Sequence, residues 1–190
     1  MFSTKITKAL KEWNVAVNAL STGEMIILLR KGGIRESTKR FEVPGHQVLL
    51  YPTFEHQDPN WVKSQYVKQV QTVESGWRSE QIAISSWAEI TAVFPVLESK
   101  IVENLLPFHI WNQAFVSERL KWKPHQPLSV LLLRVYKLPQ MILIPYQSEY
   151  AGCRSWIDLA ESIEISKEWP VIPEQLYTEK VAEICRQFED

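Results

Sequence analysis

MIILLRKGGIRESTKRFEVPGHQVLLYPTFEHQ, residues 25–57, contains two apolar runs on either side of a basic turn with two glycines. The first run, residues 25–29, has the length of a strand and stops at the sequence RKGG, residues 30–33. Glycine tolerates positive φ and the close approach of a ligand, so this turn has unusual conformational freedom. The second run, residues 47–51, ends at a proline and a polar, aromatic loop. The stretch therefore predicts two strands whose ends carry polar side chains.

The charged tips of these two strands form the candidate site. If the strands pair as neighbours, their loops bring Arg30, Lys31, Arg35, Glu55 and His56 into one neighbourhood. We interpret Glu55 and His56 as candidate catalytic residues. The candidate binding residues are Arg30, Lys31, Gly32, Gly33, Arg35 and Tyr51.

The composition is that of a globular protein with one buried core, at 190 residues with 45% apolar, 23% charged and 11% aromatic residues. No apolar run reaches the roughly 18 residues that span a bilayer, and the N-terminus lacks the apolar segment of a signal peptide. We therefore expect a cytoplasmic protein that does not insert into a membrane. Cys153 and Cys185 are expected to be free thiols, because two cysteines cannot form a disulfide framework.

The net charge of -1 conceals an uneven distribution. Residues 1–45 carry eight Lys/Arg against four Asp/Glu, a balance of +4, whereas residues 155–190 carry three against nine, a balance of -6. A basic face would suit a partner that carries phosphate. Solvated charges on a helical surface are the simpler explanation of the acidic end.

The first part of the chain allows two interpretations. Residues 3–12 have apolar side chains at helical spacing, which predicts a short helix. Residues 13–20 alternate like the first strand of a hairpin, or else they extend the helix to Gly23 as its cap. Because the two valines in this segment favour a strand, the hairpin is preferred.

Prolines and apolar runs mark the later elements. Strands are predicted at residues 81–87, 128–138 and 141–145, and the prolines at positions 95, 139 and 145 are expected to end strands. The run 128–138 is apolar almost throughout, so it is expected to be buried on both faces. Residues 62–72 fit either a helix or a strand. Helical segments are predicted at residues 97–106, 108–120, 156–162 and 173–190.

These elements predict an α+β fold in a single domain, residues 1–190, with residues 173–190 as a docked C-terminal helix. The sheet is expected to be mostly antiparallel and could curl into a barrel. It would consist of residues 13–30, 47–52, 81–87, 128–138 and 141–145, with helices at both ends and at 108–120.

Several blocks of the chain together resemble a known bacterial family, domain of unknown function 1802. The blocks are EWNVAVNAL, LLRKGGIRE, LLYPTFEHQ, PFHIWNQAF, ERLKWKP, PLSVLLLRVYKL and YAGCRSWIDL, which extend from about Ala9 to Leu159. The resemblance implies a connection to restriction-modification systems, and through them to nucleic acid. It carries over no catalytic residues.

The glycine-containing turn could cradle a phosphate. Exposed backbone N–H groups at Gly32 and Gly33, with the cations Arg30, Lys31 and Arg35 beside them, would attract an anion. The spacing does not match the nucleotide-binding pattern GxxxxGK[ST]. An ordinary glycine turn with solvated cations is therefore the simpler explanation.

The sequence gives weaker evidence for metal-dependent chemistry than for anion binding. None of the four histidines, His46, His56, His109 and His125, has the spacing that places two metal ligands on one helical face. Glu55, His56 and His109 could still meet in space. Glu98 and Lys100 spell the E-x-K of a nuclease strand, in which carboxylates bind Mg²⁺ and lysine stabilises charge on the phosphate. A proline interrupts that strand, so a chance occurrence is the simpler explanation.

The eight tryptophans are many for this length. Trp61, Trp77 and Trp122 lie beside lysine or arginine, and aromatics interleaved with cations suit stacking on unpaired bases. Core packing explains most of the others, because tryptophan carries a large apolar area.

The leading hypothesis is a non-catalytic module that binds nucleic acid or reads a modified base. Its cationic edge would be Arg30, Lys31, Arg35 and Lys39 or Arg40, with Tyr51, His56 and a nearby tryptophan as the stacking surface. The alternative is a metal-dependent phosphodiester or nucleotide hydrolase in a restriction-modification context, with Glu55, His56 and Glu42 or Glu98. A third hypothesis is a subunit that docks on another protein through its aromatic surface or last helix. The sequence identifies no cofactor, substrate or protein partner.

Overall fold

The computed structural model describes residues 4–31, 43–74, 76–77, 79–152 and 154–189. The strands are β1 (Thr4–Trp13), β2 (Ile27–Lys31), β3 (Gln47–Thr53), β4 (Gln81–Val96), β5 (Leu128–Pro145) and β6 (Trp156–Ile165). The α-helices are α1 (Asn14–Ser21), α2 (Ser99–Asn104), α3 (Gln113–Lys121) and α4 (Glu174–Cys185). Short 3-10 turns occupy Pro59–Trp61, Ser64–Gln69, Leu106–Phe108, Ser148–Tyr150 and Arg186–Phe188.

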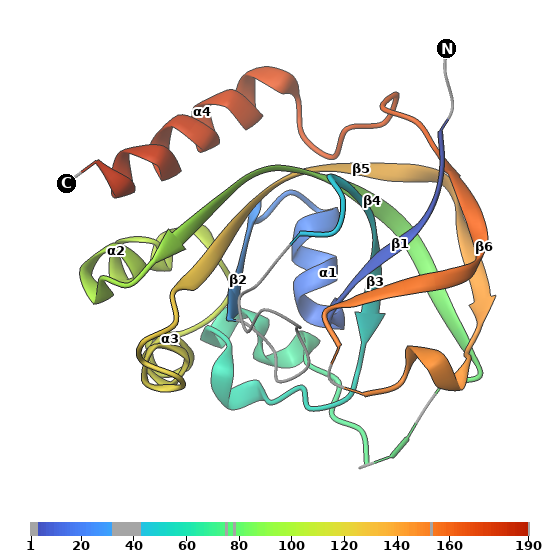
Figure 1. The fold of residues 1–190 in the computed structure, drawn as a ribbon, viewed down its shortest axis with the longest axis horizontal. Helices are drawn as coiled ribbons and strands as arrows, with labels where there is room; N and C mark the ends of the chain where they lie inside the picture. The colour runs from blue at the N-terminus through green and yellow to red at the C-terminus, as the bar shows by residue number, and fades with distance from the viewer. Residues whose placement is uncertain (1–3, 32–42, 75, 78, 153, 190) are drawn as a thin grey trace.

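The six strands form one sheet in the order β2-β5-β4-β3-β1-β6. β1 and β3 run parallel, and the other neighbouring pairs are antiparallel. The predicted α+β fold with a mostly antiparallel sheet is therefore confirmed. Over the described residues β2 and β6 remain separate end strands, so the sheet curves strongly but does not close into a barrel (Figure 1).

The two strands of the 25–57 stretch are not neighbours, and the predicted pairing is wrong. β2 pairs with β5, whereas β3 lies between β4 and β1, so two strands separate them. The long apolar strand β5 has two edges to satisfy with backbone hydrogen bonds, and β2 supplies one of them. The 15 positions between β2 and β3 reach easily across three strand spacings of about 4.8 Å each.

β1 occupies residues for which the sequence predicted a helix. It is an interior strand, in which Ala9 pairs with Leu49 on one side and with Ile157 on the other. A bulge between Ile6 and Lys8 shifts the register and breaks the alternation of side chains. The broken alternation resembles helical spacing, which explains the wrong prediction.

α1 forms where the sequence favoured a hairpin, so the alternative interpretation with Gly23 as the helix cap is correct. Gly23 has a φ of 76°, and its N–H donates to the oxygen of Leu20 at 3.2 Å. The N–H of Glu24 donates to the oxygen of Ala19 at 3.0 Å, which completes a Schellman motif. Most of α1 is buried because the sheet curves around it (Figure 1).

β4 and β5 run through prolines that the sequence analysis expected to end them. Pro95 pairs with Ser129 inside β4, and Pro139 lies inside β5. The β3 ladder reaches β4 only at residues 87–89, and the β2 ladder reaches β5 only at residues 128–132. At Pro95 and Pro139 one side of the strand has no ladder partner among the described residues, so a missing N–H is tolerated there. Residues 141–145 therefore continue β5.

Two other elements differ from the prediction. Residues 156–165 form β6 rather than a helical turn, with Ile157 and Leu159 buried and the residues between them exposed. The helix expected at 108–120 begins only at Gln113, where the side-chain oxygen of Asn112 accepts from the N–H of Phe115 at 3.0 Å.

Two clusters of buried apolar side chains lie on opposite faces of the central strands. The first cluster surrounds α1 and includes Leu10, Leu50 and Ala88. The second cluster includes Ala9, Leu49 and Trp87, together with side chains from β6 and the outer halves of β4 and β5. Because successive side chains of a strand point to opposite faces, adjacent residues of β1, β3 and β4 serve different clusters.

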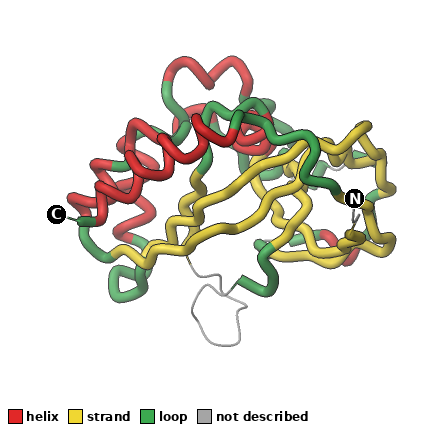
Figure 2. Tube along the Cα trace, turned by 90° about the horizontal axis from the view of Figure 1, so that it is seen from above, coloured by secondary structure: helices red, strands yellow, loops and turns green. Residues whose placement is uncertain are grey.

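α4 covers the outer face of β4 and β5 (Figures 1 and 2). Phe188, just after α4, stacks on Phe94 with ring centroids 4.4 Å apart, and the Tyr177 hydroxyl lies 2.8 Å from Oγ1 of Thr91. Across the described part of the chain, no helix has the length and apolar character needed to cross a lipid bilayer.

Candidate functional site

A pocket lies where β1 and β3 end and β4 begins, on the face of the sheet that carries the second cluster. Its aromatic lining consists of Tyr51, Phe54, Trp77, Tyr146 and Tyr150. Its polar lining includes Lys11, Thr53, Glu55 and Ser79. The volume is about 30 Å³. We call this site the aromatic pocket.

The pairing of β1 with β3 builds the inner wall of the aromatic pocket. Lys11 and Tyr51 are partners in the parallel ladder, so their side chains leave the sheet on the same face. Tyr51 meets Tyr150 edge to face, with ring centroids 6.0 Å apart at 73°. Such aromatic pairs fix the orientation of both rings.

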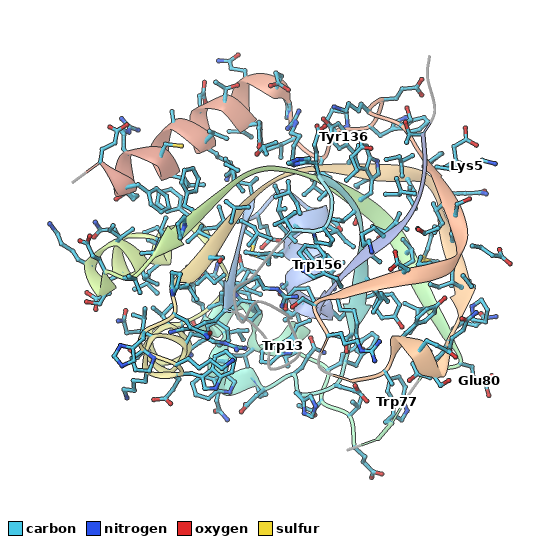
Figure 3. All side chains as sticks on the ribbon, viewed as in Figure 1. Lys5, Trp13, Trp77, Glu80, Tyr136 and Trp156 are labelled. Carbon is cyan, nitrogen blue, oxygen red and sulfur yellow. The ribbon has the colours of Figure 1, made fainter. Side chains whose placement is uncertain are left out.

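Trp77 and Phe54 form the outer wall of the pocket. Their rings also meet edge to face, with centroids 5.8 Å apart at 84°. Trp77 is 44% exposed and lies at the edge of the molecule (Figure 3). A large aromatic surface is therefore presented to solvent beside a buried tyrosine.

Lys11 places a positive charge inside the wall. It is only 7% exposed, and its Nζ donates to the backbone oxygens of Tyr150 at 2.6 Å and Gly152 at 2.9 Å. Its ammonium lies 6.0 Å from the centroid of the Tyr51 ring. The two carbonyl contacts satisfy most of the hydrogen-bonding capacity of a buried ammonium, and so stabilise the charge.

Tyr51 is 3% exposed, and its hydroxyl makes no hydrogen bond with any residue that the structure describes. Burial raises the pKa of this phenol, and the neighbouring Tyr146, Tyr150 and Glu55 raise it further. The hydroxyl therefore keeps its proton at neutral pH and is available as a donor.

Glu55 lines the aromatic pocket at intermediate exposure, whereas the next residue, His56, is exposed and does not line it. His56 has a φ of 62°, in the left-handed region. Of the candidate residues from the 25–57 stretch, the pocket thus brings together Tyr51 and Glu55. Trp77 joins them as a neighbouring tryptophan.

Arg30 lies on the other side of β1. Its guanidinium donates to Oε2 of Glu12 at 3.0 Å and to the backbone oxygen of Lys11 at 2.7 Å. Glu12 and Lys11 are consecutive in β1, so the Glu12 side chain leaves the sheet on the face opposite the pocket. The Arg30 and Glu12 side chains are only 18% and 8% exposed. Arg30 therefore serves an internal ion pair.

Lys31 also makes internal contacts. Its Nζ donates to the backbone oxygens of Arg119 at 3.0 Å and Leu120 at 3.1 Å, in the last turn of α3. These carbonyls have no partner within the helix, and a cation at the C-terminal end of a helix interacts favourably with the helix dipole. Burial lowers the pKa of Lys31. The predicted Gly32, Gly33 and Arg35, and likewise Lys39, Arg40 and Glu42, lie outside the described residues.

The other residues of the hydrolase alternative come from separate elements. Glu98 is exposed and immediately precedes α2. His109 is 3% exposed, and neither ring nitrogen has a partner in good hydrogen-bonding geometry within the described chain. Burial and then the charge of Lys63 lower the pKa of His109 to about 3. Over the described ranges, no three His, Cys, Asp or Glu side chains gather as metal ligands.

Lys11, Tyr146 and Tyr150 are among the residues of the aromatic pocket that were not singled out from the sequence. Lys11 belongs to the segment 3–12, for which the sequence predicted a helix instead of β1. The tyrosines flank a short polar loop in the sequence YQSEY, directly after Pro145. Two aromatics on one short loop are a usable signal, but only the fold brings them beside Tyr51.

A second pocket of about 360 Å³ lies near Thr4, Gln47 and Trp87. Trp87 is fully buried and stacks on Tyr136, with ring centroids 4.5 Å apart. Tyr136 and Trp77 are well separated in Figure 3, so this hollow and the aromatic pocket lie at different ends of the second cluster. The second pocket offers no exposed aromatic face.

Comparison with known proteins gives one family and one solved structure. The family model described as "Domain of unknown function (DUF1802)" matches residues 9–183. The crystal structure of ASCH from Zymomonas mobilis has a TM-score of 0.47 and 11% sequence identity, over 92% of each chain. No curated protein matches the chain. Because the family model spans most of the sequence, the chain belongs to the DUF1802 family.

Proposed function

We propose that this protein binds nucleic acid by capturing an unpaired base in the aromatic pocket. The observation that carries the proposal is the cluster of five aromatic side chains around one opening, with exposed Trp77 at its rim and buried Tyr51 at its inner wall. Base–aromatic stacking contributes about 1–3 kcal/mol per base. A base inside a duplex has no free face to offer, so the ligand is single-stranded or carries an extruded base.

The charges around the pocket define how such binding depends on salt. Arg30 and Lys31 are engaged inside the protein, and Lys11 donates to two carbonyls. Among the described residues, the one cation that lines the aromatic pocket is the buried Lys11. Stacking then outweighs phosphate contacts, and the affinity falls only gently as salt is raised.

The size of the pocket supports the finer proposal that the module reads a modified base. A volume of about 30 Å³ has room for about two water molecules and is too small for a whole base. The edge of a base can enter, while its ring stays at the mouth against Phe54 and Trp77. One added substituent on that edge would therefore change whether the base fits.

A pair of tryptophan variants tests base capture. Trp77 and Trp169 are both 44% exposed, but Trp169 lies outside the aromatic pocket. Fluorescence anisotropy with labelled single-stranded and duplex oligonucleotides, at two salt concentrations, gives the dissociation constants. Trp77→Ala is expected to weaken single-strand binding roughly tenfold, and Trp169→Ala to leave it unchanged. Equal affinities for the two variants, or a preference for duplex, would overturn the proposal.

A further inference from the structure

The inner wall of the aromatic pocket offers a hydrogen-bond donor that the protein leaves unused. The Tyr51 hydroxyl makes no hydrogen bond among the described residues, and it is not one of their fully buried unpaired side-chain atoms, so it is open to the pocket. A hydroxyl that is open to a pocket hydrogen-bonds to solvent there, and a ligand atom can replace that water. The pocket is the region in which that partner can be placed.

The local field favours an oxygen as the partner of this hydroxyl. The Lys11 ammonium lies 6.0 Å from the Tyr51 ring centroid. A positive charge at that distance, in a poorly solvated wall, attracts the negative end of a ligand dipole. Because its pKa is raised, Tyr51 stays protonated and donates. Thus the wall is suited to a carbonyl oxygen and unsuited to an amino group.

Glu55 supplies a hydrogen-bond acceptor that complements the Tyr51 donor. Its carboxylate lines the same pocket and is close enough to Tyr51 to act on its titration. An ionised carboxylate has about four acceptor positions, so it can accept from a ligand in addition to any contact within the protein. The pocket therefore combines a donor at Tyr51 with an acceptor at Glu55.

We infer that the aromatic pocket selects bases that present a carbonyl oxygen beside a ring N–H, as uracil, thymine and guanine do. The Tyr51 hydroxyl donates to the carbonyl oxygen, and the Glu55 carboxylate accepts from the N–H. Adenine and cytosine lack this pair of groups, because their corresponding ring nitrogen is an acceptor. Specificity of this kind rests on the proposed capture of a base.

The hydrogen-bonding groups of the pocket make the selection strict. About 30 Å³ is far too small for a whole base, so only one edge of a base enters, next to the Tyr51 hydroxyl. A site built to hydrogen-bond a ligand group rejects an analogue that lacks it more strongly than an apolar site does.

Oligo(U) and oligo(C) of equal length are the probes, because the two bases are of similar size and differ at this edge. The unmodified protein is expected to bind oligo(U) at least about tenfold more tightly. Tyr51→Phe is expected to reduce the preference and retain stacking, because Glu55 still distinguishes the two ring nitrogens, whereas Tyr66→Phe, which removes a hydroxyl outside the pocket, should leave it unchanged. Thermal denaturation checks that each variant is folded.

Glu55→Gln provides a second and independent readout. The amide can donate to the N3 acceptor of cytosine, so this variant is expected to shift the preference toward oligo(C). Equal binding of oligo(U) and oligo(C) by the unmodified protein, or a preference that neither Tyr51→Phe nor Glu55→Gln changes, overturns the inference. In that case base capture still stands if Trp77→Ala weakens binding and Trp169→Ala does not. Binding to neither oligonucleotide removes both proposals.

Discussion

The buried imidazole of His109 makes stability depend on pH in a window that can be worked out from the structure. His109 is 3% exposed and has a pKa of about 3, lowered first by burial and then by Lys63. The Lys63 ammonium donates to the backbone oxygen of His109 at 2.6 Å, so the charge is fixed beside the ring. In the unfolded chain a histidine titrates near 6.5.

The direction of the effect follows from the two pKa values. Between about pH 6.5 and pH 3 the unfolded chain binds a proton at His109 that the folded protein does not bind. Stability therefore rises with pH in this window and is lost as the pH falls from 6.5 toward 3. Each pH unit well inside the window contributes about 1.4 kcal/mol, so the loss between pH 7 and pH 5 is about 2 kcal/mol.

Urea denaturation at pH 7, 6 and 5, followed by tryptophan fluorescence, measures this loss. His109→Leu has a side chain of similar volume that does not titrate. Its loss of unfolding free energy between pH 7 and pH 5 should therefore be about 2 kcal/mol smaller than that of the unmodified protein. His125→Leu removes an exposed histidine and serves as the control. Most carboxylates remain ionised above pH 5, so they affect all three proteins alike. Parallel pH profiles for the unmodified protein and His109→Leu would refute the reasoning.

Three further substitutions test how the local structure is held. Gly23→Ala places a Cβ against the Ile172 side chain at a position with φ of 76°, so thermal denaturation should show a loss of about 1 kcal/mol or more. Arg30→Met leaves the Glu12 carboxylate buried without its ion-pair partner and should cost about 3 kcal/mol in urea denaturation. If adding Glu12→Gln to that variant recovers no stability, the buried charge is not the cause. Lys31→Met removes the cation at the end of α3 and should cost about 1 kcal/mol without changing oligonucleotide affinity; a large loss of affinity at unchanged stability would contradict its assignment as a helix cap.

The elements predicted best from the sequence are those whose local pattern and tertiary environment agree. The run 128–138 was expected to be buried on both faces, and all but one of its residues are buried in β5. The segment 47–52 lies within β3, and the last helix begins just after Pro173, as the sequence indicated. In each case the burial pattern alone specifies the element.

The errors come from interactions between distant parts of the chain. β1 is a strand because β3 and β6 satisfy both of its edges, and neither partner is near it in sequence. β4 continues through Pro95 because β3 ends before reaching it, a fact about a neighbouring strand rather than about residue 95. Local propensity contains no information on which edge of a strand is occupied.

The candidate site divides in the same way. The sequence supplied the residue types for stacking, Tyr51 and Trp77, and an adjacent carboxylate, Glu55. The fold decided that these three line one pocket and that Arg30 and Lys31 make internal contacts elsewhere.

By itself, the sequence determined the family, the α+β class and the strands whose apolar pattern leaves no alternative. Only the tertiary structure decided that Lys11 faces the aromatic pocket while its neighbour Glu12 faces Arg30. The physical reason is the two-residue repeat of a strand: a side chain's face depends on the register that β1 adopts between β3 and β6, and that register is set by partners about 40 and 150 positions away.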